Sequence, residues 1–344
     1  MRTPFQPSAR MRVALTLLLP LLLAAPAVGQ DAGAFARYGF GARSMAMGGV
    51  QAADVSGNAS PFHNPALAPF IPGQTLDVTT SRLAFSRTLE GAQVSAPLRP
   101  RSGVVAGFLH AGTTDIDGRD ESGYHTGTLA ADEYAFFLAF GTRFSEKLSG
   151  GLGLRVYRAS LPELRATTSL GASIGLALTP SDRLTLALTV DDLFARYRFD
   201  ASALGGGTVT DRFPTRLRAS AAWNLPAGRG TIGVEGEARI RYGSVVGPGA
   251  VTDIGGTFDE TAGRDSLRLV GGRLRLGAEV WVAEPLALRV GIDRIGAGSF
   301  DDASPSAGFA VRRRLGEVYA RLDYAAVFEA AGPPAHVVTL HVEL

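Results

Sequence analysis

The chain has 344 residues, 46% of them hydrophobic, and its 34 basic and 32 acidic side chains give a formal net charge of +2. It contains no cysteine, which excludes a fold held together by disulfides. Three arginines and no acidic residue lie in the first 29 residues, so the rest of the chain has a net charge of −1 and lacks the basic footprint of a nucleic-acid-binding protein.

The first 29 residues have the pattern of a secretory signal peptide. Arg2, Arg10 and Arg12 form a basic region, Val13–Ala25 is apolar, and the small residues of Ala27–Gly29 follow. We predict cleavage after residue 29 and export of residues 30–344. No later uncharged apolar stretch approaches the roughly 20 residues of a membrane helix, so a chain that spans a membrane must do so as a β-barrel.

Residues 30–73 have neither the period of a packed helix nor the alternation of a strand. Their centre, Gly41–Phe70, is rich in small residues and nearly free of charge. A long stretch of this kind directly before the first predicted strand needs a structural role, and the strands that follow indicate one.

Residues 74–344 alternate between apolar and polar side chains, which is typical of strands with one apolar and one polar face. Thr231–Tyr242 and Pro285–Arg294 show the pattern clearly. Most of the predicted strands have ten residues or more, close to the roughly 9–11 residues of a tilted membrane strand. Fourteen strands are predicted, beginning near Leu76, Thr88, Ser102, Glu133, Lys147, Thr167, Arg183, Thr215, Gly230, Ser266, Pro285, Ala307, Glu317 and Val337.

The connections between these strands fall into two classes. Short turns follow the even-numbered strands, and longer loops such as Thr113–Asp132 and Gly243–Asp265 follow most odd-numbered ones. Outer-membrane barrels have this asymmetry, with short periplasmic turns and long outer loops. We therefore predict an all-β fold, a transmembrane antiparallel β-barrel of about 14 strands in the outer membrane of a Gram-negative-type bacterium. A soluble β-sandwich or propeller would also alternate, but with shorter strands.

The polar face of these strands should line the lumen. The strands that begin near Lys147 and Thr167 place small side chains there, namely Ser149, Gly151, Gly153, Ser169, Gly171, Ser173 and Gly175. Later strands place an ionic wall there, formed by Arg216, Arg218, Glu235, Glu237, Arg239, Arg241, Arg273, Arg275, Glu279, Arg289, Asp293, Glu317, Arg321 and Asp323. A barrel of about 14 strands is too wide for its own side chains to fill. Residues 30–73 are therefore predicted to form a lumenal plug against the small-residue wall.

One predicted strand changes its parity. Leu267 and Leu269 occupy the apolar face before Gly271-Gly272, whereas Leu274 and Leu276 occupy it afterwards. An extra residue in one strand has this effect, so the pair of glycines predicts a β-bulge.

The stretch Gly41–Phe70 resembles the N-terminal region of PorV/PorQ-type outer-membrane proteins and, more distantly, that of the FadL long-chain fatty-acid transporters. Arg43, Met47-Gly48-Gly49 and Asn64-Pro65-Ala66 carry the likeness. The resemblance implies a fourteen-stranded barrel with an N-terminal plug, which agrees with a division into a signal peptide (1–29), a plug segment (30–73) and a barrel (74–344). Leu344 departs from the aromatic residue with which outer-membrane strands often end.

The resemblance implies two functions. FadL-like members take up hydrophobic molecules through the plug region and a lateral opening, whereas PorV/PorQ-like members handle cargo proteins in type IX secretion. An uptake route needs an apolar pocket, but the predicted lumen is ionic, and Leu109, Phe137 and Trp281 form no evident contiguous patch. We therefore expect a barrel in outer-membrane lipid that handles secreted cargo or secretion-machinery proteins. A FadL-like transporter of a hydrophobic ligand is the second hypothesis, and a structural barrel is the third.

Nothing in the sequence indicates catalysis or a cofactor, because no motif pairs a nucleophile with a base. Asp115, Asp117 and Asp120 are close enough in sequence to suggest a hard cation such as Ca²⁺. Their spacing is not that of a known calcium loop, so a solvated acidic loop is the favoured interpretation. The five histidines show no metal-ligand spacing.

Overall fold

The computed structural model describes residues 32–344, except 57–59, 163, 203–205, 245–264 and 296–302. The predicted signal peptide and its cleavage point lie outside the described residues. In the part of the chain that the structure describes, no helix has the length and apolar character needed to cross a membrane.

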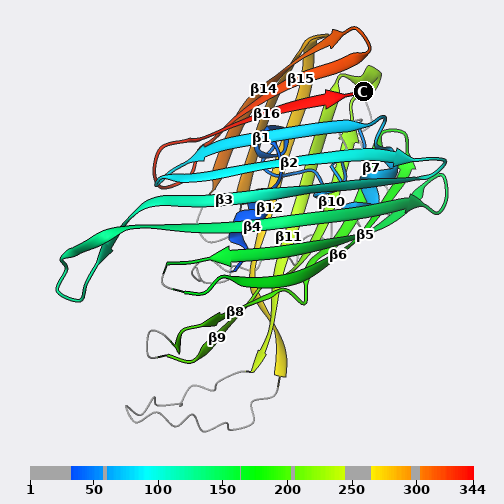
Figure 1. Cartoon of the computed structure of the whole chain (residues 1–344). Coiled ribbons are helices and arrows are strands. Elements are labelled where there is room, and N and C mark those ends of the chain that lie inside the picture. Colours follow the sequence, from blue (N-terminus) through cyan, green and yellow to red (C-terminus); the bar gives the residue numbers. More distant parts are fainter. Residues whose placement is uncertain (1–31, 57–59, 163, 203–205, 245–264, 296–302) are drawn as a thin grey trace, which may run out of the picture.

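Fourteen antiparallel strands form a closed barrel, as predicted, and β1 pairs with β16 to complete the ring (Figure 1). Closure satisfies the backbone hydrogen-bonding groups of every strand, which a sheet in lipid requires. The strands of the ring are β1 (Thr75–Leu83), β2 (Arg87–Leu98), β3 (Ser102–Arg119), β4 (His125–Arg143), β5 (Leu148–Ser160), β6 (Thr167–Ser181), β7 (Leu184–Leu193), β10 (Thr215–Asn224), β11 (Gly230–Ser244), β12 (Asp265–Ala283), β13 (Leu286–Ile295), β14 (Ser304–Leu315), β15 (Val318–Val327) and β16 (Ala335–Glu343).

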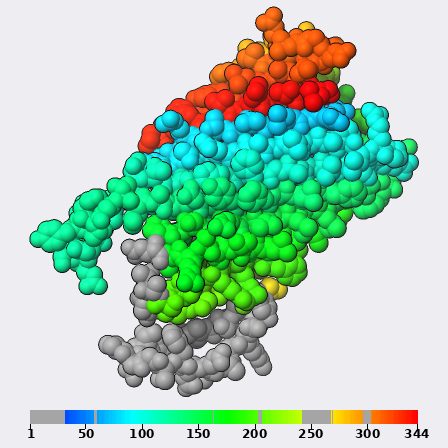
Figure 2. Space-filling view, in the orientation of Figure 1, coloured from blue at the N-terminus to red at the C-terminus, as the bar shows by residue number. Residues whose placement is uncertain are grey.

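Thirteen of the predicted strands begin within three residues of the observed ones, and the exception is β4. It begins at His125 rather than near Glu133, because β3 and β4 continue as a long hairpin that projects beyond the rest of the wall (Figures 1 and 2). Most side chains of this extension are exposed on both faces. A strand with water on both faces needs no apolar alternation, so the sequence pattern could not indicate it.

The outer face of the barrel is apolar. Leu152 and Leu170 are 63% and 59% exposed, whereas their sequence neighbours on the inner face, such as Gly153 and Ser169, are buried. Exposed apolar side chains at alternate positions suit contact with lipid.

A second, smaller sheet lies in a connection that was predicted to be a loop. It consists of β8 (Arg196–Asp200) and β9 (Thr208–Arg212), which form a separate two-stranded hairpin that is not one of the strands of the ring. The backbone N–H groups of Arg196 and Arg198 donate to the hydroxyls of Ser169 and Thr167 on β6, so side chains rather than a ladder hold the hairpin beside the wall.

The N-terminal segment, residues 32–72 where described, lies inside the barrel (Figure 1) and is called the luminal segment below. It contains two 3₁₀ turns, η2 (Ala34–Tyr38) and η3 (Pro65–Phe70), and a short helix, α2 (Ala42–Ala46). The helix α2 packs against β13–β16, and η3 packs against β2–β6 on the other side of the lumen. The side chain of Asn64 caps η3 by accepting from the N–H of Ala66 at 2.9 Å.

Glycines make room for this segment on both sides of the barrel. A Cβ on Gly151 would lie 2.7 Å from the backbone nitrogen of Ala66, and one on Gly277 would lie 2.9 Å from the Cβ of Met47. Gly48 has a φ of 64° and would bring a Cβ to 2.7 Å from the nitrogen of Ile292. At these positions the backbone of the segment lies directly against the strands because no side chain intervenes.

Two further sequence expectations have clear outcomes. The β-bulge predicted at Gly271-Gly272 is present, because Arg239 pairs with Gly271 while Ile240 pairs with Leu269. The inward position predicted for Glu317 is wrong. It lies exposed in the turn between β14 and β15, because β15 begins only at Val318.

The close approach at Gly151 gives a testable expectation. Gly151→Val should lower the free energy of unfolding in urea by about 1–3 kcal/mol, the usual cost of overpacking, because the new side chain collides with η3. Gly153→Val on the same face is the matched control, since its Cβ would have an ordinary 3.5 Å contact with Ser173. Equal unfolding free energies for the two variants would contradict the packing described here.

Candidate functional site

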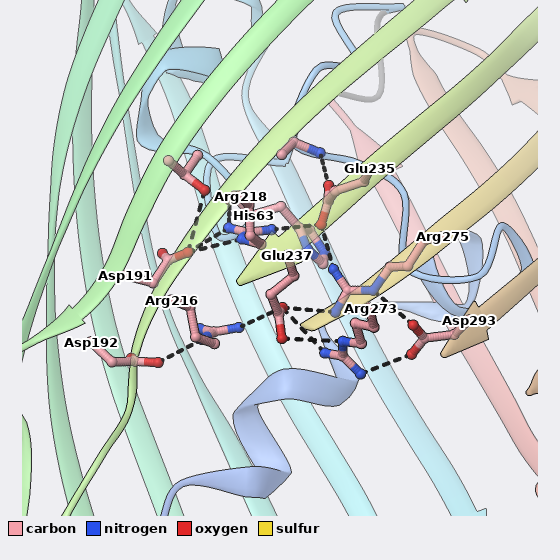
Figure 3. Close-up of polar contacts among 12 residues, drawn as sticks. His63, Asp191, Asp192, Arg216, Arg218, Glu235, Glu237, Arg273, Arg275 and Asp293 are labelled. Atoms are coloured by element: carbon pink, nitrogen blue, oxygen red, sulfur yellow. Dashed lines mark hydrogen bonds and ion pairs between the residues drawn. The ribbon is translucent and has the colours of Figure 1, made fainter. Parts of the chain in front are cut away.

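A network of ten buried or half-buried ionic side chains runs across the inner face of β5, β7 and β10–β13. Figure 3 shows its members on β7 and β10–β13. Arg275 is central. Its Nη2 donates to Glu237 at 3.0 Å and its Nε to Asp293 at 3.0 Å, and its Nη1 pairs with Glu235. We call this set the Glu237 network; its members are Arg155, Asp191, Asp192, Arg216, Arg218, Glu235, Glu237, Arg273, Arg275 and Asp293.

A second network joins the luminal segment to the wall. The guanidinium of Arg43 on α2 donates to both carboxylate oxygens of Glu279, at 2.9 and 3.0 Å, and also pairs with Asp54. Glu279 accepts from Arg289 at 2.6 Å, and Arg289 donates onward to Asp323 at 2.7 Å. We call this set the Arg43 network; its members are Arg43, Asp54, Glu279, Arg289, Arg321 and Asp323.

Charge is balanced within each network. The Glu237 network contains five arginines and five carboxylates, and the Arg43 network contains three of each. Buried charges are tolerated only when they are paired and hydrogen-bonded, and removal of one partner is then strongly destabilising. This side of the lumen is therefore a rigid, self-neutralising support.

The predicted ionic residues are divided by the structure. Glu235, Glu237, Arg273, Arg275 and Asp293 meet in the Glu237 network, whereas Arg289, Arg321 and Asp323 belong to the Arg43 network. Arg239 and Arg241 lie further along β11 and contact other groups.

The predicted plug-signature residues lie in two groups. Arg43, Met47, Gly48 and Gly49 face β12–β14, and a Cβ on Gly49 would lie 3.3 Å from Arg275 Nε. Asn64, Pro65 and Ala66 face the small-residue wall, where Ser149 donates to the carbonyl of Ala66 at 2.9 Å.

Three members of the Glu237 network were missed from the sequence. Arg155 continues the inward parity of Ser149, Gly151 and Gly153, so the pattern contained a signal for it. Asp191 and Asp192 are adjacent, yet both face inward, because Asp192 has a φ of 61° and breaks the alternation at the end of β7. No period-two pattern can indicate such a pair.

His63 connects the luminal segment to the Glu237 network. Its carbonyl accepts from Arg218, and its ring Nε2 lies 3.3 Å from the backbone nitrogen of Phe40. Burial, together with the nearby Arg218 guanidinium, lowers the pKa of His63 to about 3. The imidazole is therefore neutral at physiological pH.

Apolar side chains gather in the lumen beside the Glu237 network, where the hydroxyl of Tyr157 donates to Asp192 at 2.5 Å and Arg155 Cζ lies 4.8 Å from the ring centroid of Phe62. The rings of Phe62 and Phe137 have centroids 4.9 Å apart, and Tyr157 lies 4.7 Å from Phe213. We call this set the luminal apolar cluster; it contains Phe35, Phe40, Phe62, Leu109, Phe137, Tyr157, Tyr197, Phe199 and Phe213.

The luminal apolar cluster corrects the expectation that Leu109, Phe137 and Trp281 form no contiguous patch. Leu109 and Phe137 do belong to one, whereas Trp281 lies apart and stacks 4.0 Å below the guanidinium of Arg312. The missing partners come from the luminal segment and the β8–β9 hairpin. Strand alternation contains no information about these two elements.

The acidic candidates on the β3–β4 hairpin have local partners. Asp117 pairs with Arg119 and His125, each at 2.6 Å. Asp120 accepts from the backbone N–H groups of Ser122 and Tyr124, both at 2.9 Å, and Asp115 lies nearby in β3. Among the described residues no group of three or more His, Cys, Asp or Glu side chains is arranged to hold a metal ion.

The Arg43 network can be tested by removing its cation. Arg43→Met should lower the free energy of unfolding by about 3–5 kcal/mol, because Glu279 and Asp54 stay buried with one partner fewer. Arg183→Met, in the exposed turn before β7, is the control and should change it by less than about 0.5 kcal/mol. Urea titrations of both variants check this, and a mild effect of Arg43→Met would show that the segment is held by other contacts.

The neutral state of His63 predicts a pH dependence. An unfolded histidine takes up a proton below about pH 6.5, whereas folded His63 does not until about pH 3. Stability should therefore be lost as the pH falls from 6.5, by up to about 1.4 kcal/mol per pH unit from this group. The free energy of unfolding should fall more steeply between pH 6.5 and 4 for the unmodified protein than for His63→Gln. Parallel pH profiles would refute this.

Comparison with known proteins places the fold. No protein-family model and no curated protein sequence matches the chain. Solved structures, in contrast, do match the chain. The Pseudomonas putida toluene transporter TodX aligns over 88% of this chain and 96% of its own, at 13% identity and a TM-score of 0.55.

Two further solved structures align in the same way. The monoaromatic hydrocarbon channel CymD aligns over 89% and 97% of the two chains, at 13% identity and a TM-score of 0.56. A Pseudomonas aeruginosa FadL homologue aligns over 93% and 99%, at 12% identity and a TM-score of 0.51. The chain thus has the fold of the FadL-like outer-membrane β-barrels.

Proposed function

We propose that this protein is an outer-membrane channel for small hydrophobic molecules. The observation that carries the proposal is the luminal apolar cluster. Phe35, Phe40 and Phe62 of the luminal segment pack there against Phe137 and Tyr157 of the wall. An apolar solute gains free energy where apolar side chains replace water, so this cluster is the route that we propose for it.

In the proposal residues 30–73 act as the plug of this channel. The luminal segment contributes Phe35, Phe40 and Phe62 to the luminal apolar cluster, and the Arg43 network fixes its α2 end. The balanced charges of that wall present no net charge to a passing neutral molecule. They are proposed to support the segment rather than to take part in transport.

The structural neighbours support this order of hypotheses and reverse the one drawn from sequence. One is described as a toluene transporter, another as a monoaromatic hydrocarbon channel and a third as a FadL homologue. The sequence-based preference for a PorV/PorQ-like, secretion-associated barrel gains no support from these neighbours. That preference rested on an ionic lumen without an apolar patch, whereas the lumen contains the luminal apolar cluster. A non-enzymatic role is part of the proposal.

The proposed orientation follows the lengths of the connections. Export is proposed to depend on residues 1–29, after which the barrel inserts with its short turns in the periplasm. The short turns include those between β4 and β5, β6 and β7, and β14 and β15. The projecting β3–β4 hairpin and the β8–β9 hairpin then face the cell exterior.

Uptake of toluene by whole cells tests the proposal in a Gram-negative host that lacks its own hydrocarbon channels. Phe137→Gln should slow uptake by about tenfold, corresponding to roughly 1.4 kcal/mol, because a polar amide enters the luminal apolar cluster. Phe136→Gln is the matched control, since Phe136 is the next residue along β4 and faces outward, half exposed.

Two results would argue against the channel. The first is toluene uptake that equals that of cells without the protein. The second is uptake that Phe137→Gln and Phe136→Gln alter equally. Secreted proteins that co-purify in stoichiometric amount, without any effect on uptake, would instead support the protein-handling hypothesis.

A further inference from the structure

Two neighbouring short turns of the barrel carry a group of basic side chains. The turn between β2 and β3 contains Arg99 and Arg101, while Arg143 ends β4 and Lys147 lies in the turn that follows it. The two turns are adjacent, because the backbone N–H of Arg143 donates to the carbonyl of Arg101 at 2.9 Å. They lie at the end of β3 and β4 opposite the projecting hairpin (Figure 1).

The basic side chains of these turns have no counter-ions. Residues 97–101 and 143–148 contain four basic side chains and a single carboxylate, that of Glu146. In the part of the chain that the structure describes, none of the four forms an ion pair with a carboxylate. The hairpin at the far end of the same strands has the opposite balance, since residues 113–132 contain five carboxylates and one arginine. The positive charge at the short turns is therefore local, and it would attract an anion.

Apolar side chains border the same turns on the outer face of the barrel. Phe144 continues the outward parity of Leu138 and Phe140 past the end of β4 and is 60% exposed. Leu98 and Leu148, at the ends of β2 and β5, are exposed as well. Because the apolar outer face suits contact with lipid, its last residues lie near the level of the lipid headgroups. Arginine and lysine at this level can cover apolar surface with their stems and keep their charge among the headgroups.

One of the four basic residues has a different role. The Cζ of Arg143 lies 4.3 Å from the ring centroid of Phe70 in η3, so this guanidinium packs on the luminal segment. The other three, Arg99, Arg101 and Lys147, are exposed and are called the rim cations below. They are the cations that a ligand outside the barrel can reach.

We propose that the rim cations bind the headgroup of an anionic phospholipid, such as phosphatidylglycerol, at the membrane surface. The lipid phosphate lies against the rim cations, and the acyl chains lie against Phe144 and Leu148. A phospholipid fits these turns better than an acidic protein, because its headgroup and chains match the charge and the adjoining apolar face in one molecule. The site goes beyond the proposed function, since it concerns the lipid around the barrel rather than the solute inside it. In the orientation proposed above, this lipid belongs to the periplasmic leaflet.

Quenching of a single tryptophan by brominated phospholipids tests the site. The chain has two tryptophans, so Trp223→Phe and Trp281→Phe remove the background and Phe144→Trp places a reporter beside the rim cations. The full-length barrel is reconstituted in vesicles of phosphatidylcholine and phosphatidylglycerol, with bromine on one of the two lipids at a time. Phosphatidylglycerol should bind next to the reporter about fivefold more strongly than phosphatidylcholine, the order expected for one basic residue near an anionic surface.

The test variant removes the three rim cations from the reporter protein and should abolish this preference; it combines Arg99→Gln, Arg101→Gln and Lys147→Gln. The matched control removes the same charge from exposed positions in other short turns and should keep the preference; it combines Arg229→Gln, Arg313→Gln and Arg314→Gln. Since all six side chains are exposed, both variants should form the barrel. Heat-dependent mobility on a detergent gel confirms folding before reconstitution.

Three outcomes would overturn the assignment. The first is equal binding of the two lipids next to the reporter, which is also the result expected if these turns serve an acidic protein instead. The second is a preference that the test variant retains. The third is a preference that the matched control loses to the same extent, because the overall charge of this end of the barrel would then explain it.

The result is separable from the uptake experiment, because it measures which lipid surrounds the barrel and requires no transport. A preference for phosphatidylglycerol without toluene uptake would reject the proposed channel and retain this site.

Discussion

The Arg43 guanidinium is buried in the lumen between a carboxylate of its own segment, Asp54, and one of the wall, Glu279. Glu279 in turn shares Arg289 with Asp323, so the charge of one short helix is fixed to β12, β13 and β15. A buried ion of this kind has no low-energy alternative to its partners. The position of the luminal segment, and with it the shape of every space inside the barrel, depends on this arrangement.

Glycines, which have no side chain, position the segment together with these charges. At Gly151, Gly277 and Gly48 the backbone of the segment and the backbone of the wall come into direct contact, which any Cβ would prevent. Ion pairs alone would permit several positions of a flexible segment. Backbone contacts at glycine permit few positions of the segment, because a protein interior is packed at near-crystalline density. The segment is thus held by backbone contacts at glycine on both sides of the lumen and, on the β12–β15 side, by charge as well.

The lumen that results has two different surfaces. On the β3–β5 side, aromatic rings of the luminal segment and the β8–β9 hairpin complete an apolar surface that the wall begins with Leu109, Phe137 and Tyr157. On the β10–β15 side the surface is ionic, and its arginines and carboxylates are balanced in two networks.

The sequence by itself determined the barrel. Strand number, strand starts, the bulge at Gly271-Gly272 and the outward face of each strand follow from period-two alternation, because lipid on one side and the lumen on the other impose it on every strand. The same alternation indicated most of the ionic wall, including Glu235, Glu237 and Arg275. It failed at β4, where both faces are in water, and at Asp191-Asp192, where a positive φ breaks the period.

Only the tertiary structure decided what those residues do together. The luminal apolar cluster joins Phe62, Phe137 and Phe213, which lie far apart in the chain and in elements without a shared period. Likewise, no pattern shows that Arg43 pairs with Glu279, 236 residues away. Alternation reports on which side of a strand a residue lies, whereas contacts across the lumen depend on how the barrel closes around its own N-terminal segment.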